Sequence, residues 1–368
     1  MRTNQSFKAF LRRCALVAVP VFSYVQFTAV SEAQSIAITD MENRSVTLAK
    51  PAERIASIPI PMASTIIAFD GATSRLVGMN PRAKSAIVDG IMGKMFPEAK
   101  NISSEIVGQN FMPNVESLAS VRPDLVVQWG GRGDDIVKPL TNAGMTTMLI
   151  LYGTEERTRT YLGLIATTLG KPARALENIA WRDQVLADLA SKLSAVPADK
   201  RPRVLHISNA LTNLAVTGKG DFFGKSLELA GGKNVVDGVD WSTPTNLEQI
   251  AMWDPEVITL NGFEDELTPE FVYKNPILSL TKAAQNKRIY KLPIGGYRWD
   301  PPSQESPLMW MWAANLLHPQ IFNYDLRAET QKAFQILYSY QATQDDLDGV
   351  LRMSMHGSAA HYNIFARR

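Results

Sequence analysis

Short apolar runs and stretches of helical periodicity alternate along this chain, and such alternation is typical of an α/β protein. The clearest case is residues 114–128, where apolar residues at helical spacing lead, after a proline, into the apolar run Leu-Val-Val. The same stretch recurs without gaps 132 residues later, at 246–260, with asparagine, glutamate, alanine and proline at the same four places. An offset of that size is about one domain. The sequence therefore predicts two lobes of similar build.

Each copy of this repeat predicts a capped helix followed by a strand. Asparagine is a good N-cap, and Glu116 and Glu248 stand in the first turns, where the helix dipole favours an anion. Pro123 and Pro255 are expected to end the helices, because proline disfavours a helical conformation in the residue before it. The apolar runs that follow predict short buried strands, which we expect to be parallel.

The periodicity elsewhere gives both lobes further elements. In the first lobe we expect a leading hairpin at 36–48, strands at 54–58, 76–78 and 148–152, a helix at 63–69 and an exposed turn at 79–82. In the second lobe we expect strands at 203–207 and 288–292, helices at 222–230 and 308–317, and closing helices at 328–338 and 345–353.

Residues 172–193 predict one long helix between the lobes. The stretch has no glycine and carries proline only at its first position, where a helix tolerates it. An apolar stripe runs along it through Leu176, Ile179, Ala180, Val185, Leu186, Leu189 and Leu193. At 1.5 Å per residue the helix would be roughly 33 Å long. We therefore predict an N-terminal lobe at 34–171, a connecting helix at 172–194 that limits hinge opening, and a C-terminal lobe at 195–368.

The first 33 residues predict a cleavable signal peptide and hence secretion to the periplasm. They combine a basic start, an apolar run at 15–30, and small residues at Ser31 and Ala33 that suit cleavage after Ala33. The alternative is an uncleaved membrane anchor, but the apolar run is short and is interrupted by Pro20, Ser23 and Gln26.

Cleavage would change the charge and the cysteine content. It removes four of 38 basic and one of 36 acidic residues, leaving 34 and 35, a net charge of −1. The formal charge of +2 is therefore no argument for nucleic-acid binding. Cys14, the only cysteine, would leave as well, and its place before the apolar run argues against lipid attachment. The mature protein would then contain no disulfide.

These features together resemble the helical-backbone class of periplasmic binding proteins, which serve ABC importers of ferric siderophores, haem and cobalamin. The resemblance covers about residues 54–319. Its most specific motif is Asn-x-Glu-x-[Leu/Ile]-Ala-x-x-x-Pro-[Asp/Glu]-[Leu/Val]-[Val/Ile], present once per lobe, and the run Trp-x-x-x-Ser-x-Glu-Ser-Pro at 299–307 is similar too.

The resemblance implies a fold, a partner and a docking role. The expected fold is two similar lobes, each a mostly parallel sheet flanked by helices, joined by a rigid backbone helix. The expected protein is a monomer that delivers an iron complex, a ferric siderophore or haem, to a permease dimer in the inner membrane. Glu116 and Glu248 match the acidic residues that such proteins offer to permease arginines. A role as helix-dipole partners alone is the alternative reading of these two glutamates.

Ligands of open α/β sheets bind beyond the carboxyl ends of the strands. Applied to both lobes, this rule predicts a cleft rich in aromatic rings and arginines, which suits carboxylates or anionic chelates. For the tryptophans, core packing is the rival interpretation. The predicted ligand-binding residues are Met62, Arg82, Phe111, Trp129, Arg132, Trp241, Phe263, Tyr297, Arg298 and Trp299.

Direct metal coordination by the protein is not expected. The histidines at 206, 318, 356 and 361 lack the spacing of a metal site, and His206 is interpreted as a core residue. A chelated iron needs no protein ligand, and no resident cofactor is expected. Haem would need an axial ligand, for which Tyr297 is the candidate.

Other functions remain as alternatives. Nucleophile-elbow, Walker and GxGxxG motifs are absent, which argues against the common enzyme classes. A nitrogenase-like metal-cluster enzyme would need cysteines, and a chelatase would depend on His206. Among binding proteins the alternatives are a cobalamin protein and an oxyanion protein, for example for molybdate. An oxyanion site would be small and rich in backbone donors, whereas tryptophan and arginine suit a larger ligand.

Overall fold

The computed structural model describes residues 35–238 and 240–367. The predicted signal peptide, its cleavage site and Cys14 lie outside the described residues. The described residues belong to one compact unit. Among the described residues, none of the helices combines the length and the apolar character that crossing a bilayer requires.

Lobe one is built on a four-stranded parallel sheet in the order β4-β3-β5-β6. An antiparallel hairpin of β1 (Ile36–Thr39) and β2 (Ser45–Leu48) precedes it, as predicted. The sheet strands are β3 (Ile55–Ser57), β4 (Leu76–Met79), β5 (Leu125–Trp129) and β6 (Thr147–Ile150). The helices are α1 (Met62–Asp70), α2 (Pro81–Asp89), α3 (Ile91–Met95), α4 (Val115–Val121), α5 (Lys138–Asn142) and α6 (Glu155–Thr168).

Lobe two is built on a six-stranded sheet in which β7 pairs with β8, β9 and β11, and the strands β9, β10 and β12 each have a single partner. Its strands are β7 (Arg203–Asn209), β8 (Ala215–Val216), β9 (Lys233–Asn234), β10 (Thr243–Pro244), β11 (Val257–Leu260) and β12 (Ile289–Lys291). The helices here are α8 (Phe222–Leu229), α9 (Leu247–Trp253), α10 (Glu270–Tyr273) and α11 (Lys282–Gln285).

The two sheets share one plan. The parallel series β9-β7-β11-β12 repeats the order β4-β3-β5-β6, and lobe two adds the antiparallel strands β8 and β10. The register agrees as well: Ser57 faces Val127 in lobe one, and His206 faces Thr259 at the corresponding position of the repeat. The prediction of two similar lobes with mostly parallel sheets is confirmed.

The repeated helices end in the same way. Asn114 caps α4 and Asn246 caps α9, each accepting a hydrogen bond from the backbone N–H three residues later, at 3.1 and 2.7 Å. Each helix stops at a left-handed residue directly before the proline, Arg122 with φ 46° and Asp254 with φ 40°. The residue before each proline therefore leaves the right-handed helical region, as the sequence predicted.

A single helix, α7 (Pro172–Leu193), connects the lobes with the predicted bounds. Its buried face differs from the predicted stripe, because Leu176 is 68% exposed while Asn178 and Arg182 are buried. Arg182 donates to the Glu155 carboxylate at 2.6 Å and to the carbonyl of Ser303 at 2.8 Å. Hydrophobic periodicity could not predict this face, since buried polar residues with partners form part of it.

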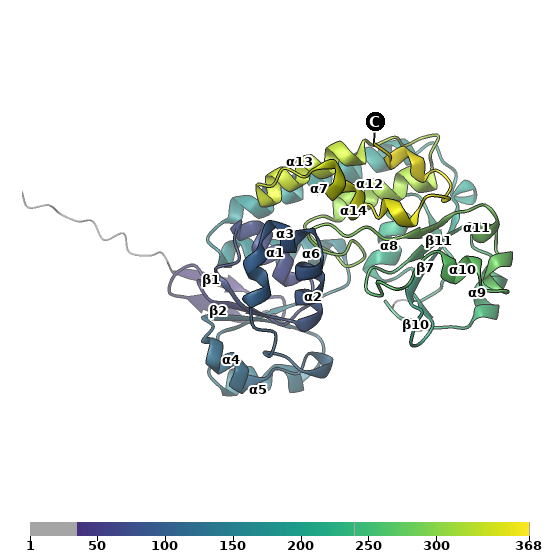
Figure 1. The fold of residues 1–368 in the computed structure, drawn as a ribbon. Coiled ribbons are helices and arrows are strands. Elements are labelled where there is room, and N and C mark those ends of the chain that lie inside the picture. Colours follow the sequence, from purple (N-terminus) through teal and green to yellow (C-terminus); the bar gives the residue numbers. More distant parts are fainter. Residues whose placement is uncertain (1–34, 239, 368) are drawn as a thin grey trace, which may run out of the picture. The chain divides into compact units, whose positions relative to one another are not determined.

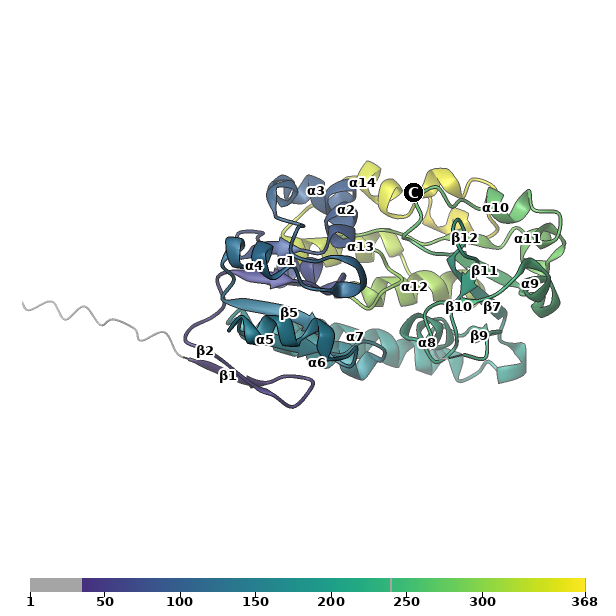
Figure 2. The same cartoon turned by 90° about the horizontal axis from the view of Figure 1, so that it is seen from below.

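The C-terminal helices return to lobe one. Helix α12 (Ser306–Leu317) is buried along its whole length, and α13 (Leu326–Tyr338) and α14 (Gln344–Val350) follow it. Arg174 of α7 donates to the carbonyls of Ala68 in α1 and Leu337 in α13. Figures 1 and 2 show α13 lying along α12. The end of the chain therefore helps to hold lobe one to the connecting helix.

The expectation of an exposed turn at residues 79–82 is wrong. Met79 belongs to β4 and is fully buried, and Asn80 is only 5% exposed. The Asn80 side chain accepts from the N–H of Arg82 and caps α2, with Pro81 in its first turn. The segment is thus a strand-to-helix junction that directs α2, and with it Arg82, toward the carboxyl end of the sheet.

Candidate ligand-binding cavity

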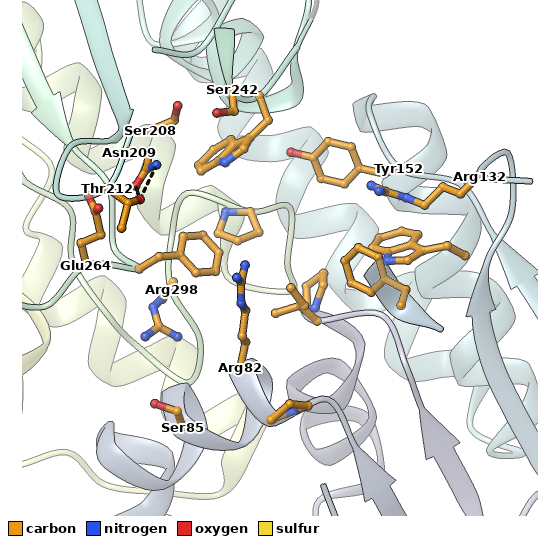
Figure 3. A pocket seen from close by; sticks show the side chains of 18 residues that line it. Arg82, Ser85, Arg132, Tyr152, Ser208, Asn209, Thr212, Ser242, Glu264 and Arg298 are labelled. Carbon is orange, nitrogen blue, oxygen red and sulfur yellow. Dashed lines mark hydrogen bonds between the residues drawn. The ribbon is translucent and has the colours of Figure 1, made fainter. Parts of the chain in front are cut away.

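A cavity of about 850 Å³ lies where loops from the carboxyl ends of both sheets meet. Figure 3 shows Arg82 rising from α2 into it, with Arg298 nearby and Arg132 beside Tyr152 on the lobe one side. Each lobe supplies half of the lining residues. They are Ile60, Pro61, Pro81, Arg82, Ser85, Phe111, Trp129, Arg132, Tyr152, Ser208, Asn209, Thr212, Trp241, Ser242, Phe263, Glu264, Arg298 and Pro301.

The wall of lobe one is an aromatic group with one cation on it. Trp129, the last residue of β5, meets Phe111 and Tyr152 edge to face, with ring centroids 6.1 Å apart in both pairs. The guanidinium carbon of Arg132 lies 5.0 Å from the Phe111 ring and 5.2 Å from the Trp129 ring. Contacts of this kind are cation–π interactions. Partial burial lowers the pKa of Arg132, and the guanidinium remains a cation at neutral pH.

The wall of lobe two is also aromatic, and a buried histidine supports it. Trp241 packs 6.0 Å from Phe263, and the His206 ring lies 5.4 Å from Trp241. Nδ1 of His206 is 2.9 Å from the Thr259 hydroxyl. Burial, helped by the charge of Lys291, lowers the pKa of His206 to about 3. His206 is therefore neutral near pH 7 and is part of the core, as predicted.

Arg298 carries the charge of lobe two and is largely fixed. It is 5% exposed, and its guanidinium carbon lies 5.0 Å from the Phe263 ring. Its Nε donates to the Gly262 carbonyl at 2.5 Å, and Nη2 is 3.9 Å from the Asp265 carboxylate. Among the described residues its Nη1 has no hydrogen-bond partner. The guanidinium is thus held by the protein and its Nη1 is buried, so Arg298 gives positive charge to this wall of the cavity rather than an accessible hydrogen-bond donor.

The one carboxylate in the lining is fully engaged. Glu264 accepts from the N–H groups of Ala210 and Leu211, both at 2.9 Å, and from Nδ2 of Asn261 at 2.8 Å. The lining thus contains three arginines and only this one glutamate, so its net charge is positive. Across residues 35–238 and 240–367, His, Cys, Asp and Glu side chains form no cluster of three that could hold a metal ion.

The structure brings seven of the ten predicted ligand residues to the cavity: Arg82, Phe111, Trp129, Arg132, Trp241, Phe263 and Arg298. Their binding role stays a prediction. Met62, Tyr297 and Trp299 are fully buried and do not line it, so their placement in the cleft needs correction. The Trp299 indole turns inward and donates to the Glu305 carboxylate at 2.8 Å. Burial raises the pKa of Tyr297 above its ordinary value.

Several lining residues were missed, although the rule that found the others also covers them. Tyr152 follows the carboxyl end of β6, and Ser208 and Asn209 end β7. The carboxyl-end rule was applied to the loops after β3, β4, β5, β11 and β12. Its extension to β6 and β7 would have found these three side chains.

The two predicted docking residues lie away from the cavity. Glu116 and Glu248 are exposed in the first turns of α4 and α9, and neither belongs to the lining. Their equal position in the two helices follows from the repeat.

Residues 102–294, just over half of the chain, match the family model described as periplasmic binding protein. This chain belongs to the periplasmic binding protein family. A periplasmic solute binding protein from Veillonella parvula has a similar structure, with a TM-score of 0.79, 31% identity, and coverage of 88% of this chain and 99% of that one.

Sequence relatives of this binding protein are named for different solutes. The molybdate-binding protein MolA of Haemophilus influenzae is 24% identical, over 88% of this chain and 96% of MolA. The Fe(3+)-citrate-binding protein YfmC of Bacillus subtilis is 26% identical, over 50% of this chain and 58% of YfmC. Family membership therefore shows that this chain is a solute-binding protein of ABC importers. It does not identify the solute, which has to be inferred from the cavity.

Proposed function

We propose that this binding protein carries an anionic ferric chelate of the siderophore type through the periplasm to an ABC importer. The observation that carries the proposal is the pair of cation-bearing aromatic walls, Arg132 on lobe one and Arg298 on lobe two, which face a cavity of about 850 Å³. Such walls suit a ligand that combines flat groups with negative charge.

The chemistry of a chelate matches the donors present. In a ferric siderophore the chelator fills the coordination sphere of the metal, so the protein has only to recognise the outer surface. Guanidinium groups bind carboxylate or phenolate oxygens through charge-assisted hydrogen bonds. The side chain of Arg82, which Figure 3 shows rising from α2 into the cavity, is such a donor, and the guanidinium of Arg132 in the lining is another.

Haem fits this cavity less well. Haem iron takes an axial ligand from the protein, and Tyr297, the expected candidate, is fully buried away from the lining. Tyr152 does line the cavity, but burial beside Asp221 raises its pKa well above the ordinary value. Its hydroxyl lies 3.5 Å from the Asp221 carboxylate and stays protonated, and a neutral phenol is a poor ligand for iron.

An oxyanion such as molybdate is the second candidate. MolA, named for molybdate, aligns with most of this chain, and the arginines would suit an oxyanion as well. The size of the cavity and its rings favour the larger ligand, since a single oxyanion needs a compact nest of donors.

The test is a ligand panel read by tryptophan fluorescence, because Trp129 and Trp241 both line the cavity. The mature protein is titrated with a ferric tricatecholate, ferric citrate, haem, cobalamin and molybdate. We expect micromolar or tighter binding of a ferric chelate, and weaker binding of the same chelator without iron. Absorbance and metal content of protein purified from its host provide an independent readout. Tight binding of molybdate with no response to any ferric chelate would overturn the proposal.

We further propose that Glu116 and Glu248 contact arginines of a permease dimer in the inner membrane. The support is their exposure and their equal place in the repeated helices α4 and α9. Changing both to alanine is expected to lower uptake at least tenfold with unchanged ligand affinity, as measured by transport in vesicles and by titration. The matched control changes two other exposed first-turn acids, Glu156 in α6 and Glu270 in α10. Equal loss of uptake in the control would contradict the docking role.

A further inference from the structure

A buried amide lies directly behind the aromatic wall of lobe one. Gln128 belongs to β5, is fully buried, and does not line the cavity. Its Nε2 donates to the carbonyl of Phe111 at 3.0 Å and to the carbonyl of Ile136 at 3.1 Å. Its Oε1 accepts from the N–H of Trp129 at 2.8 Å. All the hydrogen-bonding groups of this side chain are therefore used.

These bonds connect the loops that carry the wall. Phe111 ends the short helix η2 (Gln109–Phe111), and Ile136 ends η3 (Asp134–Ile136), which follows the loop carrying Arg132. The Arg132 loop itself has left-handed glycines at 131 and 133, with φ of 68° and 100°. One side chain thus fastens the segments on either side of the cation–π contact.

The backbone at Phe111 needs such a restraint. Asn110 and Phe111 both have positive φ, 51° and 63°. For residues other than glycine this conformation costs about 1–2 kcal/mol each, and it persists only where the surroundings hold it in place. The hydrogen bond from Gln128 to the Phe111 carbonyl is such a restraint, and it acts on the residue whose ring lies against Arg132.

The sheet itself does not require an amide here. The equivalent position in lobe two, 132 residues later, is Leu260 in β11, a buried hydrocarbon in a strand with the same parallel neighbours. A strand of this plan therefore forms with leucine. The polar side chain of lobe one serves the loops above the strand.

We propose that Gln128 is a positioning residue that sets the placement of Phe111, Trp129 and Arg132 and thereby the ligand selectivity of the cavity. The selectivity part rests on the proposed binding function, whereas the placement of the loops can be tested without any ligand. Gln128 does not touch the ligand. It acts through the two carbonyls and the one N–H that it bonds.

The test compares hydrogen exchange of the full-length mature protein with that of Gln128→Leu, which installs the residue of lobe two. Exchange in peptides covering residues 108–113 and 130–137 is expected to rise at least tenfold, while peptides of lobe two keep their rates. Leu260→Met is the matched control at the equivalent position and should leave both loops unchanged. Unchanged exchange in both loops, or an equal rise throughout lobe two, would overturn the proposal.

A second variant provides a signature that a purely structural role would not give. Gln128→Glu keeps the length and an acceptor oxygen, but its single O–H can donate to only one of the two carbonyls when the carboxyl is protonated, and to neither when it is ionised. Its loop exchange, corrected for the intrinsic pH dependence of exchange, should lie between those of the wild type and Gln128→Leu at pH 5, where one donated bond remains, and rise at pH 8 as the carboxyl ionises. A corrected rate that does not depend on pH would contradict the assignment, and this variant replaces Gln128→Leu if the latter does not fold.

The ligand arm uses a ferric tricatecholate and inorganic molybdate as probes. In Gln128→Leu, the ratio of the affinity for the ferric chelate to the affinity for molybdate is expected to fall at least tenfold. The reason is that the aromatic wall of lobe one, which would contact the flat groups of the chelate, is no longer held in place. An unchanged ratio with loosened loops would reject the selectivity role alone. Failure of the wild type to bind the chelate would reject the proposed function, and the exchange data would still decide the positioning role.

Discussion

The two walls of the cavity reach a similar surface by different means. Each presents aromatic rings with an arginine lying about 5 Å from a phenylalanine, Arg132 over Phe111 in lobe one and Arg298 over Phe263 in lobe two. In lobe one the Arg132 guanidinium, within the described residues, lies over the Phe111 and Trp129 rings and makes no hydrogen bond or ion pair. In lobe two, Arg298 is bonded to a backbone carbonyl and lies near the Asp265 carboxylate.

The difference extends beneath the rings. Lobe one has Ser57 opposite Val127 and the neutral amide of Gln128, whereas lobe two has His206 opposite Thr259 and the buried cation Lys291. Burial lowers the pKa of Lys291 to about 8. The repeat therefore sets the backbone plan of both lobes, and each lobe adds its own buried polar groups beneath the rings. We therefore expect the lobes to respond differently to acid and to loss of their arginines.

The largest difference between the lobes is expected in the pH dependence of the unfolding free energy, through protonation of His206. Its folded pKa of about 3 lies below the ordinary 6.5, so the unfolded chain binds the proton more readily. The contribution is present in full above about pH 6.5 and is lost as pH falls toward 3. Between pH 7 and pH 4 this amounts to about 3 kcal/mol of unfolding free energy. Urea unfolding at both pH values measures it.

His206→Phe isolates this contribution. Phenylalanine keeps a ring against Phe223 and Trp241, which His206 contacts at 4.3 and 5.4 Å, and it cannot titrate. Other buried groups titrate in both proteins, so only the difference between them is read. Between pH 7 and pH 4 the unfolding free energy of the variant should fall by about 3 kcal/mol less than that of the wild type. Identical pH dependence of the two proteins would show that His206 does not carry this effect.

The next effect concerns the arginine of lobe two. Arg298→Met removes the bond to the Gly262 carbonyl and the contact with Asp265, so it is expected to cost about 2 kcal/mol of unfolding free energy as well as ligand affinity. Arg298→Lys keeps a charge without the planar fork and should recover part of the stability. Chemical unfolding and chelate titration measure the two consequences separately. Full stability in Arg298→Met would mean that the guanidinium serves the ligand alone.

Much of this fold could be predicted from the sequence, because its signals are local. The repeated cap, helix, proline and strand are each encoded within about fifteen residues, and the connecting helix is a long stretch without breakers. The error at residues 79–82 has a local cause too, since Asn80 and Pro81 suit a helix start as well as a turn. The buried polar face of α7 depends on Glu155 and Ser303, which lie far away in the sequence.

The site was predicted less completely, because the direction of a side chain depends on partners in other elements. Trp299 follows a glycine-rich loop, which suggested that its side chain is exposed. In the structure the side chain is buried, because the Glu305 carboxylate accepts hydrogen bonds from the Trp299 indole and from the Tyr338 hydroxyl. Nothing near Trp299 in the sequence indicates Tyr338 of α13. Arg132 and Trp129, by contrast, were found because both stand at the carboxyl end of one strand.

The smallest expected effect on stability concerns Arg132, whose guanidinium makes no hydrogen bond or ion pair within the described residues. Arg132→Met keeps an unbranched side chain against Phe111 and Trp129 and removes the charge together with the N–H donors. Since the guanidinium has no such polar partner within the described part of the chain, the unfolding free energy should stay within about 0.5 kcal/mol of the wild type. Affinity for a ferric chelate should fall by about 1 kcal/mol, near fivefold. Titration at low and high salt tests the electrostatic origin, because the gap between variant and wild type should narrow as salt screens the charge. If Arg132→Met lost as much unfolding free energy as Arg298→Met, both arginines would stabilise the folded protein, and the proposed difference between the two walls would be wrong.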